Sequence, residues 1–217
     1  MKNILAIDTS TKNVSVSIFS EDNIMYEKCW ISKNNHSVEL IDSINKGFSK
    51  TRLSHHELDC IAVAIGPGGF SSIRVGVSMA LGLAKANNIK ILGIPTFEIE
   101  LENYRDSNYK DNLVSLVPAG FDAYCWKDIK NIGNKNPDGI VNVNDIPKTF
   151  NKDTFFCGEN LSIIFEKKLS FKYADRSHRE PKDILKLIKR IKSENTIKKY
   201  SDLTPIYSRS PNITKKK

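Results

Sequence analysis

Residues 61–88 constrain the fold more than any other part of this 217-residue chain. The apolar, largely β-branched run 61–65 meets a turn of three glycines and one proline at 66–69, after which a helix is predicted to begin at Ser71. Backbone N–H groups at such a strand–turn–helix junction can face an anion. However, the turn lacks the Gly-Lys-Ser/Thr of a P-loop, and Ser71 stands where the dinucleotide fingerprint has its third glycine. A purely structural turn is therefore the interpretation that we favour.

The helix that follows this turn is apolar on nearly every side. Between residues 73 and 86 only Arg74 and Lys85 are charged. One face carries Ile73, Val77, Leu81 and Ala84, and another carries Val75, Met79, Leu83 and Ala86. Such a helix must be covered on both sides. One side can pack on the sheet that contains strand 61–65. The other side needs a second helix, and the sequence leaves open whether this chain or a partner supplies it.

The remaining patterns predict two successive α/β units. In the first unit they predict strands at 3–9, 13–20, 23–31, 59–65 and 90–94, and helices at 36–50, 71–87 and 96–104. In the second they predict a hairpin over 113–129, mostly loop over 130–150, strands at 154–158 and 171–174, a short helix capped by Asn160, a helix at 181–194 and an irregular tail from Ser201. This order is typical of the two-lobed actin-like and ribonuclease H-like fold, in which mixed sheets are flanked by helices. We expect an N-terminal lobe over 1–105 and a shorter C-terminal lobe over 106–217.

Charge and cysteine content restrict the classes of protein to which the chain can belong. The net charge of +8 comes from residues 167–217, which hold 16 Lys and Arg against 5 Asp and Glu. This basic end is either a solvated face or a contact for nucleic-acid phosphates. The four cysteines show no metal or disulfide spacing and are expected to be free, buried thiols. We expect a cytoplasmic protein with no membrane association, because no apolar run reaches the length of a membrane span and Asp8 comes too early for a signal peptide.

Asp8, at the end of the first predicted strand, is the main candidate for cofactor chemistry. In sugar-kinase and actin-like folds an acidic residue at this place faces the metal and phosphates of a nucleotide; alternatively, its side chain caps the following turn. Together with Gly66, Gly68 and Gly69 it forms a weak candidate cofactor site. The stretch 157–160 is the only candidate phosphate loop in the second half. We therefore expect no bound cofactor, because one carboxylate is too little for a Mg²⁺–ATP site.

The histidines predict neither a metal site nor a catalytic centre. His36 begins the first predicted helix, and Leu40 stands one turn later, where a helical metal pair would need a second imidazole. His55 and His56 are adjacent and point in different directions. No Gly-x-Ser-x-Gly elbow surrounds Ser71 or Ser72.

Four segments resemble one family. They are the IDTS of 7–10, the His36-Ser37 opening of the first helix, the run DCIAVAIGPGGFSSIRVGVSMALGLA and the PIYSR of 205–209. They are similar to the TsaB (YeaZ) family of bacterial tRNA threonylcarbamoyladenosine biosynthesis proteins. In the central run, Gly66, Pro67, Gly68, Phe70 and Arg74 match the family's pattern, whereas Gly69, Ser71 and Ser72 stand where Ser, Thr and Gly are usual. The match is strongest over the first 100 residues.

This resemblance implies a non-catalytic subunit that binds and activates a related catalytic subunit, TsaD. With a TsaE-like ATPase they form a complex that transfers a threonylcarbamoyl group to tRNA, and the chain alone is a candidate homodimer. The family's contact uses the first two helices of the N-terminal lobe. The resemblance therefore implies an interface built from His36, Leu40, Ile44, Arg74, Gly76, Met79 and Leu83.

The opening of the second lobe departs from the family. Residues 117–122 lack the charges of the family's Asp-Ala-Arg-like segment, so any role of that segment is not carried over. Two other classes of function remain alternatives. One is an enzyme of the same superfamily, either an ATP-dependent phosphotransferase or a peptidase, and the other is a direct RNA-binding module.

Overall fold

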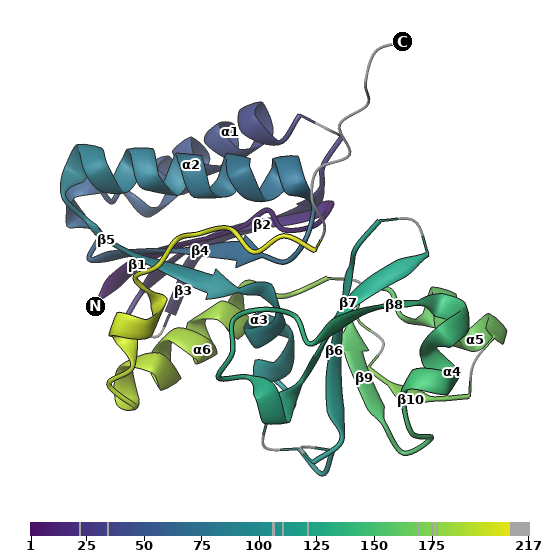
Figure 1. Ribbon diagram of the computed structural model, residues 1–217. Helices are drawn as coiled ribbons and strands as arrows, with labels where there is room; N and C mark the ends of the chain where they lie inside the picture. The colour runs from purple at the N-terminus through teal and green to yellow at the C-terminus, as the bar shows by residue number, and fades with distance from the viewer. Residues whose placement is uncertain are drawn as a thin grey trace.

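The computed structural model describes residues 1–208, with the exception of 22, 34, 106, 110, 121, 169, 175 and 177 and of the side chains of 166–168. Lys215, Lys216 and Lys217 of the basic end, and Arg209 of the PIYSR segment, lie outside the described residues. The described part forms two lobes, each built around a mixed five-stranded sheet (Figure 1).

The first sheet has the order β3-β2-β1-β4-β5. Its strands are β1 (Asn3–Asp8), β2 (Asn13–Ser20), β3 (Asn23–Ile31), β4 (Cys60–Gly66) and β5 (Lys90–Pro95). The meander β1-β2-β3 is antiparallel, whereas β4 and β5 join β1 in parallel. Because β1 and β4 are buried on both faces, they are continuous apolar runs and not alternating ones.

Helices cover both faces of this sheet (Figure 1). On one face α1 (His36–Thr51) and α2 (Phe70–Asn87) pack against Leu5, Ile7 and Val63. On the other face, α3 (Thr96–Glu102) and α6 (Pro181–Ser193) pack against Ile4, Ala6 and Ala62. These residues alternate along β1 and β4 with those named above, so their side chains point to the opposite face of the sheet.

The second sheet repeats this plan in the order β10-β9-β6-β7-β8. Its strands are β6 (Leu113–Pro118), β7 (Ala123–Asp128), β8 (Gly139–Asn142), β9 (Phe155–Gly158) and β10 (Lys172–Tyr173). Again an antiparallel meander is extended by two parallel strands. The short helices α4 (Ile146–Thr149) and α5 (Ser162–Lys168) lie on its outer side (Figure 1). The two lobes therefore share one topology, although no repeat is visible in the sequence.

Two expectations need correction. The sequence predicts that 130–150 is mostly loop, but this stretch contributes β8 and α4, because Val141 and Ile146 are buried in the second core. The expected boundary assigned all of 106–217 to the second lobe. In the structure α6 packs on the first sheet, and Ile206 donates its N–H to the Ile65 carbonyl at 2.7 Å.

No helix within the described residues is long and apolar enough to cross a membrane. The cysteines are free, as expected, but Cys29 is exposed and not buried, because it lies on the edge strand β3.

Candidate functional site

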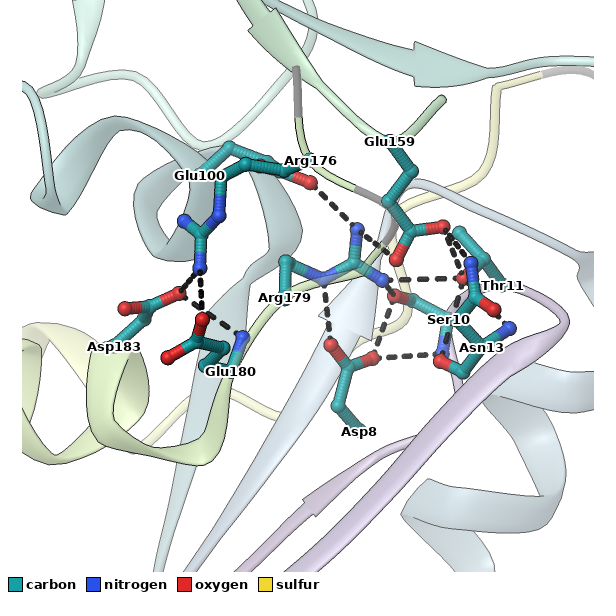
Figure 2. A network of polar contacts seen from close by, with 10 residues as sticks. All are labelled: Asp8, Ser10, Thr11, Asn13, Glu100, Glu159, Arg176, Arg179, Glu180 and Asp183. Atoms are coloured by element: carbon teal, nitrogen blue, oxygen red, sulfur yellow. Dashed lines mark hydrogen bonds and ion pairs between the residues drawn. The ribbon is translucent and has the colours of Figure 1, made fainter. Parts of the chain in front are cut away.

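A buried arginine occupies the junction between the two lobes (Figure 2). The Arg179 side chain is only 2% exposed, and its Nε donates a hydrogen bond to Asp8 Oδ2 at 2.7 Å. Its Nη1 donates to Glu100 Oε1 at 2.8 Å and forms an ion pair with Glu159 Oε1 at 3.1 Å. One guanidinium therefore serves three carboxylates. Such a fork-shaped cation suits several oxygens better than a lysine ammonium would.

Four separate parts of the chain position these groups. Asp8 is the last residue of β1 in the first lobe, and Glu159 directly follows β9 in the second. Glu100 projects from α3, whose residues join the cores of both lobes. Arg179 lies in the segment that carries the chain from β10 back to α6.

The turn after β1 and the first residue of β2 also contact Glu159 directly. Thr11 Oγ1 and Asn13 Nδ2 donate to Glu159 Oε2 at 2.8 and 3.0 Å. The backbone N–H and the hydroxyl of Ser10 donate to Asp8 Oδ1 at 2.9 and 2.6 Å. Both oxygens of Asp8 are thus engaged within the protein, the first by Ser10 and the second by Arg179.

The junction holds more carboxylates than guanidiniums. Arg176 pairs with the fully buried Asp183 at 2.6 Å and with Glu180 at 4.0 Å, so among the described residues these two guanidiniums face five carboxylates. Burial raises the pKa of Glu100 from 4.5 to about 7, against the lowering effect of Arg179 and with a contribution from Glu159. Although burial alone would lower it, the surrounding carboxylates hold the pKa of Arg179 well above its usual value. The network is therefore a fixed cation surrounded by a surplus of acid.

We expect Glu100→Gln to remove a pH dependence of stability. Because the folded pKa of Glu100 is about 7 and its usual value is 4.5, the folded chain binds more protons than the unfolded chain between these pH values. The free energy of unfolding therefore falls as pH rises through this window, by on the order of 3 kcal/mol from this group. The glutamine can still accept the hydrogen bond from Arg179 and should flatten the profile.

The measurement is urea unfolding from pH 4.5 to 8 for the wild-type chain, Glu100→Gln and the exposed control Glu27→Gln. The control should follow the wild type. Equal slopes for all three chains would show that Glu100 is ionised in the folded state throughout this range.

A cleft of about 1120 Å³ opens beside this network and is lined by both lobes. Of the four residues predicted as a weak cofactor site, Gly68 and Gly69 line this cleft, but Gly66 and Asp8 do not. A Cβ at Gly66 would lie 2.2 Å from the Ile206 carbonyl oxygen, so this glycine faces the C-terminal segment. Asp8 is 1% exposed beneath Arg179. The nucleotide-bound metal that an actin-like fold implies therefore does not fit at Asp8, whose oxygens already have donors.

The structure also bears on the candidate phosphate loop at 157–160 and on possible metal sites. In the stretch 157–160, Glu159 directs a carboxylate to the junction, which disfavours a phosphate. No group of His, Cys, Asp and Glu within the described residues is arranged to hold a metal ion.

A second, mostly apolar groove of about 550 Å³ runs along α2. Three of the predicted interface residues, Arg74, Met79 and Leu83, line it together with Val75 of α2 and Ser37 of α1. Met79, Leu83 and Val75 are half-buried, whereas Ile73 and Val77 on the opposite face are buried against the sheet. As the sequence predicts, α2 has two apolar faces, one packed on the sheet and one lining the groove.

The remaining four predicted interface residues lie elsewhere. Leu40 and Ile44 are fully buried between α1 and the first sheet, because they form the stripe that holds this helix in place. Gly76 is buried where a Cβ would lie 2.3 Å from Thr9 Oγ1. His36 lines the cleft between the lobes and not the groove. The apolar residues that α1 exposes are instead Val38 and Ile41.

Sequence reasoning missed Arg179 as the partner of Asp8 and Glu100 as a further partner of Arg179. Glu100 lies in the predicted helix 96–104, which is indicated only by its Pro95-Thr96 opening, and Arg179 lies within the basic end. The one signal available was an arginine two residues before Pro181, which opens α6, and this pattern is common in solvated segments. The pairing of Arg179 with Asp8 spans 171 positions and has no local signature.

Residues 30–184 match the sequence model of a family described as TsaD: tRNA N6-adenosine threonylcarbamoyltransferase. The chain is 32% identical over 120 residues to the tRNA threonylcarbamoyladenosine biosynthesis protein TsaB of Bacillus subtilis, covering 55% of this chain and 50% of that protein. It is 28% identical over 169 residues to TsaB of Buchnera aphidicola from Acyrthosiphon pisum, covering 76% of this chain and 66% of the relative. The chain thus spans about half to two thirds of the length of these relatives.

The fold matches a solved structure over its whole length. YeaZ from Pseudomonas aeruginosa superposes with a TM-score of 0.72 at 19% identity, covering 95% of this chain and 100% of that one. A second structure, titled an uncharacterized protein with similarity to peptidase YEAZ from Pseudomonas aeruginosa, gives 0.73 at 18% identity, covering 96% and 100%. The two-lobed actin-like fold predicted from the order of elements is confirmed.

Proposed function

This chain belongs to the TsaD family, and on that premise we propose that it is a non-catalytic subunit that binds and activates a TsaD-type catalytic subunit. Within the family its named relatives are TsaB proteins of tRNA threonylcarbamoyladenosine biosynthesis. The assembly proposed for it includes a TsaE-like ATPase and acts on tRNA in the cytoplasm.

The observation that carries the proposal is the apolar groove on α2. Val75, Met79 and Leu83 present a continuous apolar strip on a rigid helix of 18 residues. A rigid helix face with an apolar centre suits a partner helix of the same kind, because two such strips can bury each other. Arg74 at the same groove adds a polar contact that fixes orientation.

Two features disfavour catalysis by this chain alone. Asp8 is held by Ser10 and Arg179, so it is not free to position a nucleotide's metal. Leu40 stands where a metal pair on α1 would need a second histidine, and it is buried in the core. The phosphotransferase and peptidase alternatives both need groups of this kind.

The test is reconstitution. The purified chain alone should neither hydrolyse ATP or peptides nor modify tRNA. With a TsaD-type subunit, a TsaE-like ATPase and a threonylcarbamoyl donor it should form threonylcarbamoyladenosine in tRNA, measured by mass spectrometry of nucleosides. Light scattering after gel filtration would report both the complex and any homodimer of the free chain. Turnover by the chain alone that disappears in Asp8→Asn would instead support the enzyme alternative.

A further inference from the structure

We propose that Arg179 is an internal cation that locks the two lobes in one arrangement, taking at Asp8 the place that an actin-like fold gives to a nucleotide's metal. This lock needs no partner subunit, because the chain supplies both the cation and the carboxylates. It rests on the position of one buried guanidinium among carboxylates from both lobes (Figure 2).

The first step is the origin of the carboxylates. Asp8 comes from the first lobe and Glu159 from the second, and both lie within 3.1 Å of guanidinium nitrogens. Without a cation between them, two buried carboxylates would repel each other across the junction. Arg179 turns this repulsion into a bridge, so the lobes attract each other beside the cleft that both of them line.

The second step is the dependence of neighbouring contacts on this charge. Thr11 and Asn13 of the first lobe donate to the Glu159 carboxylate. Arg179 Nη2 also donates to the Ser10 hydroxyl at 2.9 Å and to Thr11 Oγ1 at 3.3 Å. The cross-lobe hydrogen bonds are thus organised around the guanidinium, and they lose their fixed acceptor if Glu159 is left unpaired.

Arg179 differs from a metal ion that arrives with a nucleotide, because it cannot leave the site. In an enzyme whose lobes close on a nucleotide and its metal, closure depends on ligand. Here the positive charge is covalently part of the chain, in the segment that joins β10 to α6. The lobe arrangement is therefore permanent and independent of nucleotide.

The coupling between the two lobes can be followed by tryptophan fluorescence. It has two tryptophans, Trp30 on β3 in the first lobe and Trp126 on β7 in the second. Single-tryptophan variants, Trp126→Phe and Trp30→Phe, report the urea unfolding of each lobe separately. In the otherwise wild-type background both should give the same midpoint, and millimolar MgATP should shift neither.

We expect Arg179→Ala to separate the two midpoints, with the Trp126 signal unfolding at lower urea than the Trp30 signal by about 1 M. Methylguanidinium at tens of millimolar, which can enter the vacated position, should bring the midpoints back together. Arg179→Lys keeps a charge but loses the fork, and it should give a smaller separation. The matched control is Arg190→Ala, which removes an arginine paired with Glu102 and Glu194 within the first lobe. It should keep the midpoints coincident and gain nothing from methylguanidinium.

The proposal is overturned if Arg179→Ala and Arg179→Lys both keep coincident midpoints, because the arginine would then stabilise the fold without coupling the lobes. A rise in the wild-type midpoints with MgATP that disappears in Asp8→Asn would overturn it as well. If Arg179→Ala does not fold, Arg179→Lys alone decides between coincident and separated midpoints.

Discussion

Leu83→Glu and Met79→Glu are expected to leave the chain folded and to weaken its binding to a TsaD-type subunit by about 30- to 1000-fold. Both side chains are half-buried on α2 and line the apolar groove. In the free chain a glutamate at either position can reach water through the open side of the groove. In the complex the same carboxylate would be desolvated without a partner, which costs several kcal/mol.

The measurement is a titration of the labelled catalytic subunit with each variant, accompanied by thermal unfolding of the free chain. Ser193→Glu is the control, because it adds the same charge at the exposed end of α6, on the opposite face of the first sheet. Wild-type affinity in both groove variants would place the interface elsewhere. Unfolding of both free variants would show that this face of α2 is core.

Gly66→Ala is expected to destabilise the chain by about 3 kcal/mol or more. Gly66 has φ +102°, in a region that side chains with a Cβ rarely adopt. The added methyl would also lie 2.2 Å from the Ile206 carbonyl oxygen and 2.9 Å from Ile73 Cδ1. Relief of these contacts requires the C-terminal segment to move away from β4, which breaks the hydrogen bond between Ile206 and Ile65.

Gly82→Ala provides the matched control for this prediction. Gly82 lies within α2, and a Cβ there would meet nothing within 4 Å. Alanine favours helix over glycine by about 0.5–1 kcal/mol, so this variant should be slightly more stable than the wild type. Urea unfolding of both variants gives the comparison. A Gly66→Ala chain within about 1 kcal/mol of the wild type would mean that the C-terminal segment is not held at this glycine.

Most of the elements could be read from the sequence, because each depends on local periodicity. The alternation over 13–20, the buried run 61–65 and the helical spacing over 181–194 reappear as β2, β4 and α6 within a residue or two. The second apolar face of α2 was also visible, since a helix shows all of its faces in its sequence. The prediction for 130–150 missed β8, because this strand is only four residues long and half-exposed, which leaves almost no period to detect.

Only the tertiary structure decided which apolar faces remain open and where the buried charges meet. The sequence shows that Leu40 and Ile44 form an apolar stripe on α1, but not that the first sheet covers it completely. It shows Asp8 at the end of a strand and Arg179 before a helix. It does not show that Arg179 Nε and Asp8 Oδ2 lie 2.7 Å apart. The physical reason is that hydrophobic periodicity is a property of neighbouring residues, whereas an ion pair depends on the path of the whole chain between its partners. For this protein the sequence therefore determined the elements and the two-faced helix, and the return of α6 to the first lobe determined the buried junction.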